Sequence, residues 1–517
     1  MAGLYQGPAT GVASTPELRG IMPSMLARGT KTPTTATSAA ARNAMGLGVS
    51  WLALGIATAA ACRPTPASDP TTQPAPAPAT EPVADARGGD LPPTPPPDEV
   101  TALLAAVDAA QVMDTVTSLA GFGTRHTLSE DTETRGIGAA RRWIHARLSA
   151  AGPRLDVSFD SHPMGPDGRR IDRPVAVVNV VAILPGTMPE ATARHYYVIG
   201  HYDSRASDPM DAEGDAPGAN DDASGVAVVL ELARVLADQS LDSTVVFMAT
   251  AGEEQGLLGA RAHAEASVAA GTDIRAVLSN DIVGDPTAPD GSRNDTHVRL
   301  FSEGLPAWID DAQLQRLRTL SGTSDGPSRQ LARTIDAVAR WHGLPVRPRL
   351  ILRHDRFLRG GDHTAFNAMG VAAVRFTEVG EHYDRQHQDP RTEGDRRFGD
   401  APEFVDRDYL AGVARLNLAA LVHLANAPST PADARMVATA LAIDTTLQWS
   451  RAPEPDVAGY EIVWRATTEA QWTHAQDVGD VTEATLPLHK DDYFFGVRAY
   501  DADGYRSPVA FPAVVRS

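Results

Sequence analysis

Histidine and carboxylate side chains that could hold a metal ion follow several short apolar runs of this chain. His201 and Asp203 come directly after the run YYVIG at 196–200. An imidazole binds a metal through one ring nitrogen, and a nearby carboxylate can accept a hydrogen bond from the other nitrogen and so fix the tautomer. Taken alone, such a pair also occurs in proteins that bind no metal.

Two adjacent aspartates, Asp221 and Asp222, lie in the run PGANDDASG just before a predicted helix at 223–237. Carboxylates in this position often cap a helix, because they accept hydrogen bonds from its first N–H groups and suit its dipole. The flanking glycines, Gly218 and Gly225, suit an unusual backbone. Together with the upstream histidine, they make metal binding an alternative interpretation.

Glu253 and Glu254 come after the strand predicted at 244–249. Two consecutive carboxylates repel each other without a counter-charge, so the pair indicates either a solvated turn or one metal ligand beside one general base. Asp281 also follows a predicted strand, and His387 lies on the loop after the last one. Each of these two residues would be ordinary if it occurred alone.

These side chains become informative as a set. The carboxyl ends of parallel strands meet at one edge of a sheet, which is where α/β folds bind ligands. Two histidines and several carboxylates without a thiolate suit Zn²⁺, with Mn²⁺ or Co²⁺ as alternatives. The number of carboxylates favours two ions that share one acid.

The elements that would position this set belong to an α/β fold. Near-continuous apolar strands that alternate with helices are typical of a mostly parallel mixed sheet with helices on both faces. The predicted strands lie at 175–184, 196–200, 244–249, 276–278 and 371–376, and the predicted helices at 99–119, 134–151, 223–237, 256–269 and 409–425.

The ordered motifs resemble those of the co-catalytic dizinc exopeptidases, metallopeptidase family twenty-eight. That group includes bacterial leucyl-type aminopeptidases, glutamate-releasing carboxypeptidases and glutaminyl cyclases. The resemblance implies the zinc exopeptidase fold over residues 98–427, two Zn²⁺ per chain and peptide substrates. It rests on HYDS at 201–204, GANDDASG at 218–225, GEEQGLLGA at 252–260 and the loop that carries His387.

The resemblance implies a ligand set for two ions, carried over by motif. Asp221 would bridge both ions. His201 and Asp281 would complete the shell of one ion, and Glu254 and His387 would complete the shell of the other.

It also implies supporting roles. Glu253 would be the general base and then the general acid, and Asp203 would hold the first histidine. Asp222 would share a cis peptide bond with the bridging aspartate, as members of the family do. The run GGDHTAFNAMG resembles the family's Asp-His-x-x-Phe segment, which makes Asp362 and His363 pocket candidates without an assigned role.

The expected reaction is removal of N-terminal residues from peptides, because acidic surroundings suit the cationic amine of a substrate. A carboxypeptidase of the same fold is one alternative. A non-catalytic receptor on this fold is another, although no implied ligand is missing. Cyclisation of glutamine is disfavoured because family cyclases typically have serine in place of Asp222. The run QHQD around His387 departs from the Tyr-His-Thr that aminopeptidases often have, and no H-E-x-x-H motif is present.

Composition narrows the choice of partners and sites. The 517 residues include 46 Lys and Arg against 65 Asp and Glu, a net charge of −19. This balance argues against nucleic acid and against adsorption to anionic membranes, since both attract basic surfaces. The single cysteine, Cys62, excludes an internal disulfide and a thiolate metal site.

The N-terminal region resembles an export signal. An uncharged apolar run at 46–61 follows basic residues and ends at Cys62, as in a bacterial lipobox, although Ala59 stands where leucine is commonest. We expect residues 1–61 to be cleaved and Cys62 to carry a lipid anchor in the periplasm or at the cell surface. Ordinary signal cleavage and secretion is the alternative. The Pro-rich segment 62–97 would be a tether.

Residues 432–517 have a different pattern of apolar and polar residues from the preceding chain. Short alternating segments separated by turns predict an all-β sandwich. Trp449, PDVAGYEIVWR at 455–465 and YFFGVRAYDADGYRSP at 493–508 resemble a fibronectin type III domain. Such a domain could contact another protein or a surface, or it could act as a spacer or a stabilising cap.

Overall fold

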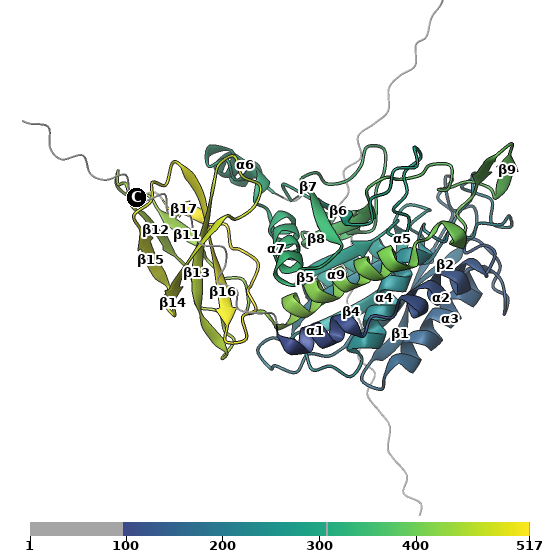
Figure 1. The fold of residues 1–517 in the computed structure, drawn as a ribbon, viewed down its shortest axis with the longest axis horizontal. Coiled ribbons are helices and arrows are strands. Elements are labelled where there is room, and N and C mark those ends of the chain that lie inside the picture. The colour runs from purple at the N-terminus through teal and green to yellow at the C-terminus, as the bar shows by residue number, and fades with distance from the viewer. Residues whose placement is uncertain (1–96, 307–308, 516–517) are drawn as a thin grey trace, which may run out of the picture. The chain divides into compact units, whose positions relative to one another are not determined.

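The computed structural model describes residues 97–306 and 309–515 (Figure 1). The predicted signal at 1–61, Cys62 and all of the predicted tether except its last residue lie outside this part. Within the described residues, no single helix is long and apolar enough to cross a membrane. One bent pair of helices, Asp98–Ala105 and Ala109–Ala120, would together be long and apolar enough to cross a membrane, on length and composition alone.

One mixed eight-stranded sheet organises residues 98–427, which confirms the predicted fold class. Its strand order is β1-β2-β4-β3-β5-β8-β6-β7. The four central strands β4, β3, β5 and β8 run parallel, and antiparallel pairings flank them. The strands are β1 (Asp156–Met164), β2 (Val175–Leu184), β3 (Arg194–His201), β4 (Thr244–Thr250), β5 (Asp273–Asn280), β6 (His297–Ser302), β7 (Arg347–Ile351) and β8 (Ala373–Glu378).

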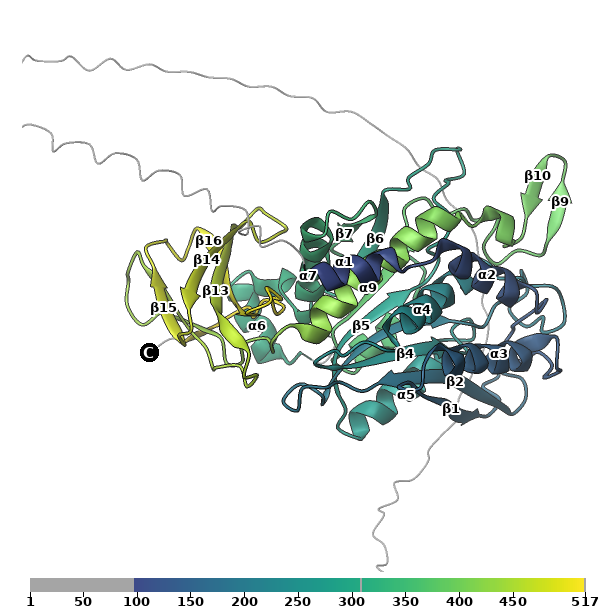
Figure 2. The same cartoon turned by 60° about the horizontal axis from the view of Figure 1, so that its bottom comes forward.

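Helices cover both faces of this sheet. β4 and β8 are buried along their whole length, as expected for central strands covered on both sides. One large core contains α2, α4, α7 and α9, and a smaller core contains α5 and α8. Figure 2 shows α2, α4 and α9 next to one another. The helices are α1 (Asp98–Ala105), α2 (Ala109–Ala120), α3 (Gly136–Ala151), α4 (Ala223–Leu236), α5 (Leu258–Ala269), α6 (Asp311–Thr319), α7 (Pro327–Trp341), α8 (His363–Ala368) and α9 (Arg407–Asn426).

The prediction of a single helix at 99–119 is wrong, because the helix is interrupted between α1 and α2. Asp108 caps α2 by accepting a hydrogen bond from the N–H of Ala110 at 2.8 Å. Its own N–H donates to Oε1 of Glu231 at 2.6 Å. The polar backbone and side chain of Asp108 are therefore satisfied outside a continuous helix, and the apolar spacing alone could not indicate this.

β3 and α4 approach each other closely at the edge where the candidate residues gather. A Cβ added to Gly200, the residue before the last of β3, would lie 2.6 Å from the carbonyl carbon of Gly225 in α4. A larger residue at position 200 would push the two elements apart. Glycine at this position therefore brings the end of β3 and the start of α4 to one place.

The described residues after 434 form two further sheets. One has the order β15-β12-β11-β17 and the other β14-β13-β16. They share a core that includes Trp449, Tyr460 and Trp464, so this region is all-β as predicted. Its strands are β11 (Arg435–Val437), β12 (Thr445–Gln448), β13 (Val457–Ala466), β14 (His474–Gly479), β15 (Glu483–Leu486), β16 (Tyr493–Asp501) and β17 (Ala513–Val515); β9 (Arg391–Glu393) and β10 (Arg396–Phe398) form a separate hairpin.

Candidate active site

The candidate residues meet at one edge of the large sheet, as the strand-end pattern predicted. His201 is the last residue of β3, Asp281 directly follows β5, and Glu254 lies four residues beyond β4. The start of α4 adds Asp221, and the loop after β8 adds His387. Since β3, β4, β5 and β8 are parallel, their carboxyl ends lie side by side and bring these side chains together.

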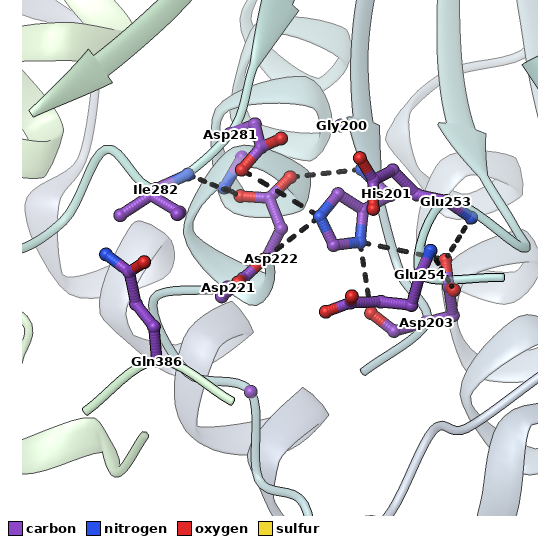
Figure 3. Close-up of polar contacts among 12 residues, drawn as sticks. Gly200, His201, Asp203, Asp221, Asp222, Glu253, Glu254, Asp281, Ile282 and Gln386 are labelled. Carbon is purple, nitrogen blue, oxygen red and sulfur yellow. Dashed lines mark hydrogen bonds and ion pairs between the residues drawn. The ribbon is translucent and has the colours of Figure 1, made fainter. Parts of the chain in front are cut away.

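Two groups of possible metal ligands share one aspartate. Nε2 of His201 lies 3.1 Å from Oδ1 of Asp221 and 3.9 Å from Oδ1 of Asp281. Nε2 of His387 lies 3.0 Å from Oδ2 of Asp221 and 2.9 Å from Oε1 of Glu254. The two oxygens of Asp221 thus face different groups, each of which could hold one ion. Figure 3 shows the side chains around His201.

The donor atoms of these groups fit zinc. Nε2 of His201 and Oε1 of Glu254 are buried and make no hydrogen bond within the described residues. Buried polar atoms are rarely left without a partner, so these two atoms fit the role of metal donors. Imidazole nitrogen and carboxylate oxygen without a thiolate form a common zinc shell.

The electrostatics of the shared aspartate agree with this geometry. Although burial acts in the opposite direction, the imidazoles of His201 and His387, which lie 3.1 Å and 3.0 Å from its oxygens, hold the pKa of Asp221 well below its usual range. Asp221 is therefore a carboxylate at neutral pH. A deprotonated carboxylate with both oxygens directed at imidazoles is suited to bind two cations.

Asp203 links the first histidine to the glutamate pair. Its backbone oxygen lies 3.1 Å from Nδ1 of His201, and its carboxylate Oδ1 lies 3.6 Å from the same nitrogen. The carboxylate also accepts hydrogen bonds from the N–H groups of Glu253 at 3.2 Å and Glu254 at 3.1 Å. Asp203 thus fixes the imidazole mainly through its backbone, and it fixes the loop after β4 through its side chain (Figure 3).

Asp222 ties three elements together. Its carboxylate accepts hydrogen bonds from the N–H groups of His201 at 3.0 Å, Gly225 at 2.8 Å and Ile282 at 3.3 Å. The helix-cap interpretation therefore holds for Asp222, whereas its neighbour Asp221 points into the site. The peptide bond between these two aspartates is cis, as the resemblance implied.

Glu253 occupies the position expected of a general base. It is half-buried and lines the pocket beside the two ligand groups. Burial raises its pKa well above the ordinary value; His201 opposes this shift, and the charges of Asp281 and Glu254 add to it. A carboxyl group with a raised pKa is a better proton acceptor, which suits a base that must later return the proton.

The pocket candidates Asp362 and His363 do not line the pocket. Both are buried at the start of α8, which packs against α5 and β8. Asp362 accepts a hydrogen bond from the hydroxyl of Thr250, and Nε2 of His363 lies 3.0 Å from the carbonyl oxygen of His354. The two residues therefore hold the start of α8 in place below the edge of the sheet.

Two buried residues near the ligands were not predicted. Nη2 of Arg375 lies 2.8 Å from Oδ1 of Asp281, so it holds one ligand from β8. Asp400 accepts hydrogen bonds from the N–H of Asp221 at 2.7 Å and from the N–H of Asn220. An arginine inside an apolar strand is unusual, and Arg375 could have been noticed on that ground. Asp400 lies in a loop and carries no comparable signal.

A pocket of about 640 Å³ opens over the ligand groups. Besides ligands and Glu253, seven arginines line it. The expected surroundings were acidic, so this lining is more basic than predicted. The arginines are Arg169, Arg170, Arg205, Arg261, Arg356, Arg359 and Arg375.

The chain also contains one G-x-S-x-G run, GTSDG at 322–326. It does not follow a strand, as a serine-hydrolase elbow would, but forms a 3₁₀ turn after α6. The hydroxyl of Ser324 accepts a hydrogen bond from Arg329 at 2.8 Å and does not line the pocket. This serine has the surroundings of a structural residue.

Comparison with known proteins agrees with these features. Residues 179–400 match the sequence profile of Peptidase family M28. A "Probable zinc metalloprotease" of Pyrenophora tritici-repentis is 42% identical over 433 residues, covering 82% of this chain and 89% of that protein. One from Leptosphaeria maculans is 44% identical over 422 residues, covering 81% and 97%. The crystal structure of the Legionella pneumophila LapA aminopeptidase aligns with 20% identity and a TM-score of 0.44, covering 64% of this chain and 75% of that one.

Proposed function

The chain belongs to peptidase family M28 and is a zinc metalloprotease, and from this premise we propose that it is an exopeptidase that removes N-terminal residues from peptides. The observation that carries the proposal is the shared position of Asp221 between two ligand groups, with Glu253 beside them. We propose two zinc ions per chain, with Mn²⁺ or Co²⁺ as substitutes. His201, Asp221 and Asp281 would hold one ion, and Asp221, Glu254 and His387 would hold the other.

We assign the residues around this site separate roles in hydrolysis. When bound, zinc would supply Lewis-acid catalysis and lower the pKa of a water molecule. Glu253 would accept a proton from the attacking water and then donate it to the nitrogen of the leaving amine. Asp203 would keep Glu253 in place through its hydrogen bond to the N–H of that residue. Arg375 would hold Asp281 in the orientation that faces the first ion.

A carboxypeptidase is the second candidate, and the arginines of the pocket favour it. Guanidinium groups bind carboxylates, and a C-terminal residue presents one directly beside the scissile bond. The carboxylates that line the pocket support an amine-binding site less than expected, because three of them also belong to the proposed ligand groups.

Glu253→Gln tests the proposed chemistry. Removing a general base should lower kcat by about 10²–10⁴-fold, while zinc content measured by elemental analysis should stay near two ions per chain. Glu265→Gln is a matched control, since Glu265 is exposed on α5. Assays should compare aminoacyl, acyl-amino-acid and N-terminal glutaminyl substrates. Wild-type turnover by Glu253→Gln would contradict the assignment, and one tightly bound ion would reopen the cyclase alternative.

We also propose that the chain is exported and anchored through a lipid on Cys62. Mass spectrometry of the mature protein should find residue 62 at the N-terminus with added acyl mass. An unmodified N-terminus near this position would instead support ordinary signal cleavage. For the C-terminal β region, we propose a fibronectin type III-like fold that caps the peptidase. Arg465 of this region forms a buried ion pair with Asp325 just before α7, and Trp472 donates a hydrogen bond to Gln330 on α7.

A further inference from the structure

We propose that Arg359 and Arg205 form a subsite for a carboxylate of the substrate, next to the metal centre; this rests on the proposed peptidase function. Both arginines line the pocket with the ligand groups. Nη1 of Arg359 lies 3.3 Å from Nδ1 of His387, and Nε of Arg205 lies 3.7 Å from Oε2 of Glu254. The two arginines thus adjoin two ligands of the same proposed ion.

The other central arginines are already paired. Arg375 contacts Asp281 at 2.8 Å and Asp355 at 3.3 Å. Arg356 pairs with Glu381 and also lies 3.3 Å from Asp355. Both arginines are nearly or fully buried, so their charges are neutralised by the protein and they serve to hold the pocket wall.

Arg359 differs from this pair in its surroundings. Within residues 97–306 and 309–515, no carboxylate lies within ion-pair distance of its guanidinium. The guanidinium lies 5.8 Å from the ring centroid of Tyr383, and its one polar contact among the described residues is with His387. Arginine has five N–H donors and no acceptor, so most of these donors are unused. The side chain is half-buried and faces the pocket. An entering carboxylate could accept two parallel hydrogen bonds from such a group.

Arg205 also has an N–H donor without a hydrogen-bond partner in the described part of the chain. This donor is Nε, and the side chain is only 15% exposed. The Glu254 oxygen at 3.7 Å is its nearest ion-pair partner, and Glu254 is also a proposed metal ligand. Cations added to this centre would leave the surrounding arginines with an excess of positive charge. A substrate carboxylate is the group that would balance this excess.

The remaining acid of the pocket does not compete for these arginines. Asp167 uses Oδ1 to accept hydrogen bonds from the N–H groups of Arg169, Arg170 and Ile171. The size of the pocket suits a ligand of two or three residues. A carboxylate bound here therefore belongs to a residue close to the scissile bond. It can be the C-terminal α-carboxylate or the side chain of Asp or Glu.

Matched peptides distinguish these two sources. One pair differs only in a free or amidated C-terminus, and the other has Glu or Gln at one position of an amidated peptide. Wild-type enzyme should prefer the charged member of at least one pair. Arg359→Gln should raise KM for that member by about 10–100-fold and change KM for its neutral partner little, because a hydrogen bond to a charged group is lost. Arg205→Gln should act in the same direction, and Arg359→Lys should restore part of the affinity.

Binding and metal content complete the test. Zinc-loaded Glu253→Gln should bind the charged peptide more tightly than its neutral partner by calorimetry, and the added Arg359→Gln should remove that difference. Zinc content should not change in Arg359→Gln. Arg316→Gln, exposed on α6 and outside the pocket, is the matched control.

Equal affinity of wild-type enzyme for both members of each pair would overturn the subsite while leaving peptide hydrolysis intact. Equal loss on charged and neutral peptides in Arg359→Gln would also overturn it. Absence of Glu253-dependent hydrolysis of every peptide, with zinc bound, would instead overturn the proposed function.

Discussion

The metal pocket and the junction with the C-terminal strands both bury charged side chains, but they pair them differently. At the junction, Asp325 lies 2.9 Å from Nη1 of Arg333, and both its oxygens lie 2.9 Å from Nη2 of Arg465. Nη1 of Arg194 lies 3.3 Å from Oε1 of Glu454. Each of these buried acids faces an arginine that the protein itself supplies.

In the pocket, several of the acids lie next to one another instead of each facing its own arginine. Burial raises the pKa of Asp281, although Arg375 opposes the shift, and burial raises the pKa of Glu253 further above its usual value. Neighbouring carboxylates in a low-dielectric site repel one another unless a cation joins them. The acids of the junction are therefore neutralised by their own arginines, whereas the adjoining carboxylates of the pocket suit added cations.

Asp221→Asn should have the largest effect, because it changes the residue shared by both ligand groups. We expect zinc content to fall below one ion per chain. Activity should drop by about 10³-fold or more, since metal ions contribute several kcal/mol to transition-state stabilisation. Elemental analysis and peptide hydrolysis measure the two effects, and Asp238→Asn, exposed after α4, is the control. Full zinc content with normal activity would show that Asp221 is not shared by two metal ions.

Asp325→Asn should have the largest effect on stability. It leaves Arg333 and Arg465 buried without their shared carboxylate, and breaking a buried pair costs about 3–5 kcal/mol. Urea denaturation should report this loss, whereas hydrolysis by the folded fraction should remain normal. A loss of activity without a loss of stability would show that the junction serves the site rather than the fold.

The pH dependence of stability should reveal another buried group at the junction. His423 on α9 lies with Nε2 2.9 Å from the carbonyl oxygen of Arg506, and burial lowers its pKa to about 3. The folded protein keeps this histidine neutral, whereas the unfolded chain protonates it below about pH 6.5. The unfolded state therefore binds more protons between these two pH values. The free energy of unfolding consequently decreases as pH falls from about 6.5 towards 3.

His423→Gln should flatten this dependence between about pH 6.5 and pH 4. One group of this kind contributes a slope of up to about 1.4 kcal/mol per pH unit. Urea denaturation of both proteins at several pH values measures the difference. An unchanged slope would mean that His423 is protonated in the folded protein or does not titrate differently on unfolding.

The sequence predicted the fold and the candidate ligands for physical reasons. Apolar β-branched runs define central strands, and polar residues after them must gather at one edge once the strands are parallel. His201, Asp221, Glu254, Asp281 and His387 therefore came together as expected.

What the sequence did not predict depends on contacts between distant segments. Arg359 and Arg205 are 154 positions apart and meet only because two loops line one pocket. The acidic surroundings were expected from the motifs alone, which contain the carboxylates and omit most of these arginines. Asp362 has the residue type of a pocket group, but its burial beneath the edge follows from how α8 packs.

Loss of an exposed ion pair should have the smallest effect on stability, because solvent already stabilises its charges. Arg451 pairs with Asp480 between loops of the C-terminal β region, and their side chains are 56% and 41% exposed. Solvent and salt screen such a pair, so Arg451→Gln should leave both the thermal midpoint and hydrolysis unchanged within error. Arg465→Gln, the same substitution at the junction, should lower the midpoint clearly, because Asp325 would lose a buried partner. Equal shifts in both variants would mean that pairing itself, rather than burial, sets the importance of these charges.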